Sequence, residues 1–206
     1  MRTETVGVTE TLIESAKKEF LEHGFQNANL RRISSESGVS TGSIYTRFGD
    51  KAGLFSAVVK PAADGLMELY LESITAARES GDPAEATSQG NEGTELVLKY
   101  IYDNFDVFKL IFCHSAGTEY ERYFDELAEI EEKYYREFVK QFSRRDNMVS
   151  DFFIHVICRT GWSYIYEVVS HDLSYDEAQI FMKSIREFCF AGWGKVLGQN
   201  YEDLGL

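Results

Sequence analysis

The sequence predicts an all-α protein in which an N-terminal three-helix domain, containing a helix-turn-helix, is followed by a larger helical bundle. Apolar residues recur at helical spacing along nearly the whole chain, and only two prolines, Pro61 and Pro83, interrupt it. Within residues 29–51, a glycine separates two short segments that each begin with a helix-capping residue, as in a helix-turn-helix. We therefore expect two domains, residues 1–55 and residues 56–206.

The first helix is expected from about Thr9 to His23, with its apolar residues on one stripe and Gly24 ending it in a left-handed conformation. After the two short helices, Asp50 is expected to cap a longer helix, which Pro61 should kink or break.

Residues 79–93 are linker-like in composition and are expected to form an exposed loop with at most a helical turn. Ser174 and Glu177 have the spacing of a capping box at the start of the last helix. The helices expected beyond the loop cover about residues 94–104, 106–115, 119–144, 149–171 and 174–200.

Composition excludes several classes of protein. With 44% apolar and 27% charged residues, the chain has the balance of a folded protein rather than a disordered one. No apolar run approaches the roughly 20 residues that span a bilayer, and a signal-peptide core is absent, so we expect a cytoplasmic protein without membrane contact. Cys113, Cys158 and Cys189 are far apart and are expected to be reduced structural thiols.

The net charge of −13 is unevenly distributed. Residues 1–55 hold seven basic and seven acidic side chains, whereas residues 56–206 hold fourteen basic and twenty-seven acidic ones. A nucleic-acid binder needs positive charge close to the phosphates rather than over the whole protein. Four side chains in or beside the motif can supply it, namely Arg31, Arg32, Arg47 and Lys51. This weak local charge favours modest affinity unless two copies bind together.

The helix-turn-helix motif covers about residues 29–48. Its pivot is Gly38, because the chain must reverse within about three residues and glycine accepts a left-handed conformation there. Asn29 and Ser40 can cap the two helices. The exposed side of the second helix carries small or hydrogen-bonding groups that suit the major groove of DNA, namely Thr41, Gly42, Ser43, Tyr45, Thr46 and Arg47.

This segment resembles the TetR family of bacterial transcriptional regulators, whose motif is read as I-A-x-x-A-G-V-S-x-G-x-x-Y-x-x-F-x-x-K. Here the run from Ile33 to Leu54 is I-S-S-E-S-G-V-S-T-G-S-I-Y-T-R-F-G-D-K-A-G-L, so Ser34 and Ser37 replace the usual alanines. A helical serine can bond the carbonyl four residues before it, so we expect a small loss of stability and no change of fold. The resemblance covers about residues 9–60; the remainder is similar only in length, helix content and a two-helix dimer face.

The resemblance implies that Tyr45 and Lys51 bond phosphates and that Gly42 lets the helix approach the backbone. Independently, Arg47 suits guanine or a phosphate, and the N-terminus of a helix attracts phosphates. Tyr45 and Arg47 could instead pack on the first helix or pair with Asp50. The residues expected to contact DNA are Asn29, Arg31, Ser40, Thr41, Gly42, Ser43, Tyr45, Thr46, Arg47 and Lys51.

Residues 56–206 carry eleven Phe, eleven Tyr and both Trp, more aromatic surface than a compact helical core usually needs. An aromatic or apolar small-molecule effector, with a cation among the candidates, would suit a pocket of such residues, although any single one could be ordinary core. The aromatic candidates are Tyr102, Phe105, Phe108, Phe112, Tyr164 and Tyr166, with His114, His155 or Glu167 as polar anchors.

The last two helices are apolar over a wide surface, which favours a subunit interface, with burial in the monomer as the alternative. The interface candidates are Phe153, Ile157, Gly161, Phe181, Ile185, Phe188, Gly192 and Trp193.

These features predict a homodimeric transcriptional regulator, a repressor that a small molecule releases from a palindromic operator in double-stranded DNA. One alternative is a DNA-binding helical protein without an effector, either architectural or bound to a partner. The other is a helical-bundle enzyme, but the Glu-x-x-His, H-E-x-x-H and G-x-S-x-G patterns are all absent. We therefore expect no catalytic residue, metal or cofactor.

Overall fold

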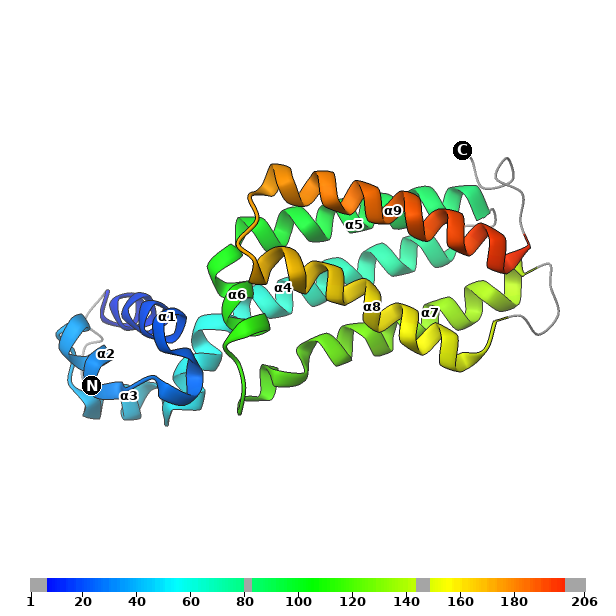
Figure 1. The fold of residues 1–206 in the computed structure, drawn as a ribbon. Helices are drawn as coiled ribbons and strands as arrows, with labels where there is room; N and C mark the ends of the chain where they lie inside the picture. Colours follow the sequence, from blue (N-terminus) through cyan, green and yellow to red (C-terminus); the bar gives the residue numbers. More distant parts are fainter. Residues whose placement is uncertain (1–6, 80–82, 144–148, 199–206) are drawn as a thin grey trace. The chain divides into compact units, whose positions relative to one another are not determined.

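The computed structural model describes residues 7–79, 83–143 and 149–198. All the elements in these residues are helices, as the sequence predicted (Figure 1). They are α1 (Val8–Asn27), α2 (Leu30–Ser37), α3 (Thr41–Phe48), α4 (Lys51–Glu79), α5 (Pro83–Asp103), α6 (Phe105–Cys113), the 3-10 helix η1 (Glu119–Arg122), α7 (Tyr123–Phe142), α8 (Asp151–Ser170) and α9 (Tyr175–Leu197).

Contacts divide the chain into two compact units. The N-terminal unit comprises residues 1–65 and 104–123, and the bundle unit comprises residues 66–103 and 124–206. Helix α6 and η1 thus belong with α1–α3 although α5 separates them in the sequence. The functional boundary expected between residues 55 and 56 stays a prediction.

The core of the N-terminal unit is built on aromatic rings. The rings of Phe20 and Phe55 meet edge to face at 5.0 Å, and Phe25 lies 5.4 Å from Phe55. Both Phe20 and Phe55 are fully buried, so they contribute large apolar area at the centre of the unit. The backbone N–H of Phe25 donates to the carbonyl of His114, 3.0 Å away, which joins the end of α1 to the end of α6.

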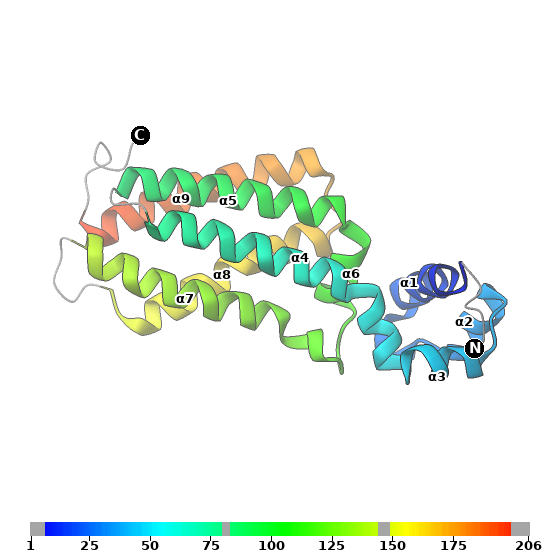
Figure 2. The ribbon, with the colours of Figure 1, turned by 180° about the vertical axis from the view of Figure 1, so that it is seen from behind.

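In the bundle unit, α5 runs alongside α9 and α7 runs alongside α8 (Figures 1 and 2). Arg186 of α9 pairs with Glu95 of α5 at 2.8 Å. The Tyr102 hydroxyl donates to the carbonyl of Leu173, 2.9 Å away, at the turn between α8 and α9. The capping box predicted at the start of α9 is present, because Ser174 and Glu177 bond each other's backbone N–H groups.

The loop predicted for residues 79–93 is wrong over residues 83–93, since α5 begins at Pro83, and residues 80–82 lie outside the described residues. Proline is compatible with the first helical position, where its missing N–H would have no helical partner. Gly93 is buried, and a Cβ atom added to it would lie only 2.8 Å from the Cβ of Ser73 on α4. Glycine at position 93 therefore allows α4 and α5 to pack closely, and this packing outweighs the low helix propensity of glycine.

Two further expectations need correction in detail. Helix α4 does not break at Pro61 but continues from Lys51 to Glu79, with Val59, Ala62 and Ala63 buried beside the proline. Gly24 has the positive φ that was expected, 69°, but its ψ is 165°, outside the left-handed helical region, and α1 resumes as far as Asn27.

We predict that Gly93→Ala lowers the free energy of unfolding by about 1–3 kcal/mol, because the new methyl group collides with Ser73. Gly90→Ala is the matched control on the same helix, since nothing lies within 4 Å of its added Cβ. It should instead stabilise α5 by about 0.5–1 kcal/mol. Urea denaturation followed by circular dichroism measures both, and equal effects would contradict the packing.

Candidate DNA-binding site

The helix-turn-helix forms by the local interactions that the sequence predicted. Gly38 adopts φ 69° and ψ 11°, which is the left-handed conformation expected at the turn. The side chain of Asn29 accepts a hydrogen bond from the backbone N–H of Arg31 at 2.8 Å. Ser40 accepts one from the N–H of Ser43 at 3.2 Å, so both predicted caps are confirmed.

Ser37, one of the two serines that replace alanine, has a role in the turn. Its hydroxyl donates to the carbonyl of Ile33 at 2.7 Å, as expected for a helical serine. The same oxygen accepts from the backbone N–H of Val39 at 3.3 Å, beyond the pivot glycine. The serine thus links the end of α2 to the residue that leads into α3.

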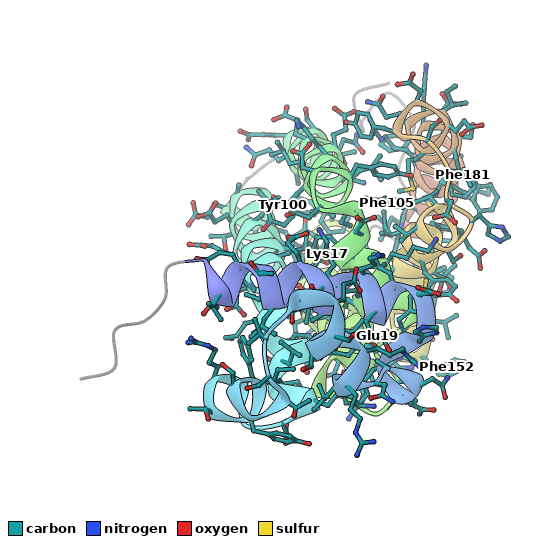
Figure 3. The ribbon with its side chains drawn as sticks, turned by 90° about the vertical axis from the view of Figure 1, so that its left-hand side faces the viewer. Lys17, Glu19, Tyr100, Phe105, Phe152 and Phe181 are labelled. Atoms are coloured by element: carbon teal, nitrogen blue, oxygen red, sulfur yellow. The ribbon has the colours of Figure 1, made fainter. Side chains whose placement is uncertain are left out.

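A buried carboxylate fixes α2 against α1 (Figure 3). Glu19 is only 5% exposed and accepts hydrogen bonds from Arg32 Nε at 2.8 Å and from the backbone N–H of Asn29 at 2.8 Å. Burial alone raises the pKa of Glu19, but the hydrogen bonds from Arg32 and Asn29 outweigh it and hold the pKa below its ordinary value. Sequence reasoning missed this pair; the signal was a glutamate directly before Phe20 on the apolar side of the first helix.

Five of the predicted DNA contacts line one concave patch of the N-terminal unit. The five are Asn29, Arg31, Thr41, Tyr45 and Lys51. Ala28 and Leu30 line the patch as well. Tyr45 is 54% exposed, unusually high for an aromatic side chain. Among the described residues, Arg31 forms no ion pair, whereas Arg32 and Lys18 are held by Glu19 and Glu36.

Lys51 also forms contacts within the N-terminal unit. Its Nζ donates to the carbonyls of Gln26 and Ala28, at 3.0 and 3.2 Å, and lies 4.7 Å from the centroid of the Phe25 ring. The ammonium group therefore satisfies carbonyls at the end of α1, where a cation is favoured.

The other predicted contacts on α3 are Gly42, Ser43, Thr46 and Arg47. Thr46 donates to the carbonyl of Gly42 at 2.8 Å, and Arg47 is half-buried. A Cβ atom at Gly42 would lie 3.9 Å from the Ser40 hydroxyl, so this side of the helix start is open. Contact of any of these residues with DNA stays a prediction.

Comparison with known proteins supplies the family. Residues 12–58 match the description "Bacterial regulatory proteins, tetR family". They form a TetR-family DNA-binding domain.

The curated relatives of the TetR-family domain include the HTH-type transcriptional repressor AcnR of Corynebacterium glutamicum, 37% identical over 62 residues. AcnR of Corynebacterium efficiens is 35% identical over 68 residues. These matches cover 30% and 33% of this chain and 33% and 36% of the relatives, so the chain spans about a third of their length.

Solved structures resemble the chain far beyond the TetR-family domain. The regulator PfmR from Thermus thermophilus has a TM-score of 0.64 at 18% identity, covering 92% of this chain and 95% of PfmR. The ketosteroid regulator KstR2 of Mycobacterium tuberculosis has a TM-score of 0.62 at 15% identity, covering 95% of each chain. The fold is therefore that of TetR regulators, as the sequence predicted.

The residues predicted to bind an effector are divided between the two units. Phe105, Phe108, Phe112 and His114 belong to the N-terminal unit, whereas Tyr102, His155, Tyr164 and Glu167 belong to the bundle unit. Several have structural partners: Phe108 is fully buried, His155 Nδ1 lies 2.7 Å from Glu132, and exposed Glu167 pairs with His171 at 3.2 Å. The effector role of the set stays a prediction.

A groove of about 170 Å³ lies between α7 and α8 of the bundle unit. Tyr166, one of the aromatic candidates, lines it. The other lining residues, which sequence reasoning missed, are Phe124, Asp125, Ala128, Arg159, Trp162 and Ser163.

The candidate interface residues on α8 and α9 differ in exposure. Phe188 is 71% exposed and Gly192 is also exposed. Trp193 instead packs within the bundle unit, stacked on Tyr135 with ring centroids 4.9 Å apart. The others, Phe153, Ile157, Gly161, Phe181 and Ile185, are half-buried.

In the parts of the chain that the structure describes, no three His, Cys, Asp or Glu side chains gather where a metal could bind. Over the same residues, none of the helices combines the length and apolarity needed to cross a bilayer.

We predict that Glu19→Gln lowers the free energy of unfolding by about 1–3 kcal/mol at pH 7, because the charge-assisted bonds to Arg32 and Asn29 are weakened. Since the pKa of Glu19 is lowered in the folded state, its contribution is present above the ordinary carboxyl pKa and is lost as pH falls through the lowered value. The difference from wild type should therefore shrink below about pH 4.

Glu14→Gln is the control, since Glu14 is 70% exposed on the same helix and, among the described residues, forms an ion pair with Lys17 alone. Its effect should be within about 0.5 kcal/mol. Chemical denaturation at pH 7 and at a series of acid pH values separates the variants, and a pH-independent loss in Glu19→Gln would argue against the ionised pair.

Proposed function

We propose that the protein is a transcriptional repressor that binds a palindromic DNA operator as a homodimer and is released by a small molecule. The observation that carries this proposal is the patch of the TetR-family domain where Arg31, Thr41, Tyr45 and Lys51 meet. The curated relatives of this domain are repressors by name, which supports the direction of regulation.

The patch has the chemistry of a DNA contact. The N-terminus of α3 presents backbone N–H groups, Tyr45 offers an exposed hydroxyl, and Arg31 offers a guanidinium group. Phosphate oxygens accept hydrogen bonds from all three kinds of donor, and α3 is the helix that would enter the major groove.

A dimer is supported by the apolar surface of α8 and α9. Phe152, Val156, Ile180 and Phe188 are 75%, 42%, 70% and 71% exposed, and Figure 3 shows Phe152 projecting from the bundle unit. Large exposed apolar side chains gathered on two helices are typical of a subunit interface. Two copies related by a twofold axis would bind half-sites about 34 Å apart. Binding through two domains at once would offset the weak affinity expected from the neutral net charge of residues 1–55.

Release by an effector requires only that the effector bind one dimer conformation more tightly than another. Couplings of about 1–3 kcal/mol are typical, corresponding to an affinity change of roughly 5–150-fold.

We predict that Arg31→Ala weakens binding to DNA from beside the gene by about tenfold and lowers the slope of log affinity against log salt by about one, as for the loss of one phosphate contact. The control is Lys60→Ala, since Lys60 is exposed, paired with Asp64 and absent from the patch. Fluorescence anisotropy at several salt concentrations measures both. Absence of specific binding by the wild type, or equal effects of the two variants, would contradict the DNA-binding assignment of the patch.

We predict that Phe188→Glu yields monomers and weakens operator binding by at least tenfold, because a charge would be buried at the centre of the proposed interface. The side chain is 71% exposed in the monomer, so folding should be retained.

Gln179→Glu adds the same charge nine residues earlier on α9, which is on the opposite side of the helix at 3.6 residues per turn. It should leave the dimer intact. Sedimentation velocity gives the mass of each variant, and a dimer that survives Phe188→Glu would exclude this surface.

A further inference from the structure

Lys51 connects two parts of the N-terminal unit that are distant in the sequence. It is the first residue of α4, and its Nζ donates to the carbonyl of Gln26, 25 positions earlier, at 3.0 Å and to that of Ala28 at 3.2 Å. We call these two bonds the Lys51 clamp. Figures 1 and 2 show the start of α4 next to the end of α1, where the clamp forms.

The chain that receives these bonds, residues 26–29, joins α1 to α2, and we call it the joining segment. Arg32 Nη2 donates to the carbonyl of Asn27 at 3.1 Å, between the two carbonyls that the lysine holds. At the other end of the segment, the backbone N–H of Asn29 donates to Glu19 at 2.8 Å. The last carbonyls of a helix have no helical partner and favour cations. Side chains from outside the joining segment therefore fix its path.

The joining segment forms part of the concave patch. Ala28 and Asn29 line the patch together with Arg31, whose backbone N–H is bonded by the Asn29 side chain at 2.8 Å. The same patch includes Thr41 and Tyr45 of α3. A change in the path of the joining segment would therefore move Arg31 relative to α3.

The ammonium group of Lys51 is largely engaged by these contacts. It has three N–H donors, of which two bond the carbonyls of the joining segment, and it lies 4.7 Å from the centroid of the Phe25 ring. A phosphate that recruited this ammonium group would compete with the clamp. Arg31, by contrast, forms no ion pair in the part of the chain that the structure describes.

We propose that Lys51 acts in DNA binding as a positioning residue, which holds the joining segment so that Asn29 and Arg31 face DNA together with α3. Without the clamp, the joining segment samples other paths. DNA then binds only the fraction of molecules with the correct path, which lowers the apparent affinity. This inference rests on the proposed DNA-binding function, whereas the clamp itself does not.

Hydrogen exchange of the full chain without DNA, followed by mass spectrometry, tests the clamp. In Lys51→Met, which keeps an apolar stem but loses the ammonium group, the backbone N–H groups of residues 26–33 should exchange at least about fivefold faster than in the wild type. Lys51→Arg keeps the charge and the donors, so its exchange should stay within about twofold of the wild type.

Lys60→Met is the matched control for exchange, because Lys60 lies on the same helix, is exposed and pairs with Asp64. Its exchange over residues 26–33 should equal that of the wild type. Lys51 is only half-buried, so Lys51→Met should fold, and circular dichroism verifies this at the temperature of each assay.

Fluorescence anisotropy with DNA from beside the gene, at several salt concentrations, tests the role in binding. Lys51→Met should weaken binding by about tenfold, the scale of one charge-assisted hydrogen bond. The slope of log affinity against log salt should fall by less than about half a unit, whereas the loss of a phosphate contact lowers it by about one. Lys51→Arg should bind within about threefold of the wild type, and Lys60→Met should bind like it.

A double-mutant cycle with Arg31→Ala shows whether Lys51 acts through the patch. If Lys51 positions Arg31, part of the loss in Lys51→Met is already present in Arg31→Ala. The double variant should then bind at least about threefold more tightly than the product of the two single losses predicts. Two independent phosphate contacts would give losses that multiply.

A slope lowered by about one together with multiplying losses would make Lys51 a phosphate contact and overturn the proposal. Unchanged exchange or unchanged affinity in Lys51→Met overturns it as well, and leaves the DNA-binding function intact. Absence of specific DNA binding by the wild type refutes the DNA-binding function and with it this role, even where exchange shows that the clamp is present.

Discussion

The position of α2, and through it that of α3, depends on the buried carboxylate of Glu19. This carboxylate bonds the guanidinium group of Arg32 and also the first backbone N–H of the helix-turn-helix, that of Asn29. Since Asn29 then caps α2 with its own side chain, one chain of hydrogen bonds runs from the core of α1 to the start of the motif. Gly38 and Ser40 set the direction of α3 from there. The surface proposed to contact DNA is thus determined by a few interactions that lie beneath it.

Each unit contains a glutamate whose pKa is shifted, and the two shifts have opposite directions. In the N-terminal unit, Glu19 is fully paired, and the pKa of this carboxyl is lowered despite its burial. In the bundle unit, Glu131 is left without a cation and burial raises its pKa to about 8. The first arrangement stabilises a fixed geometry. The second arrangement disfavours the ionised form of the carboxyl group.

Helices α8 and α9 carry more apolar residues than one bundle can cover. One side of α8 contributes Ile154, Cys158 and Trp162 to the interior, and a second side leaves Phe152 and Val156 exposed. The sequence shows that these helices are apolar but not which residues lie inside, because the crowding blurs the helical periodicity. The prediction that Trp193 lies at a subunit interface shows this difficulty, since its ring is stacked on Tyr135 of the same bundle.

By itself, the sequence determined the helical class, the turn at Gly38, the caps at Asn29 and Ser40, and the face of α3 that carries Tyr45. All of these follow from interactions between residues a few positions apart, which a sequence displays directly. Tertiary structure decided that residues 83–93 are helical, since only the close approach of Ser73 explains Gly93. It also distinguished Glu131 from Glu132, two adjacent glutamates with the same local pattern, because His155, which pairs with Glu132, comes from α8 and is distant in the sequence.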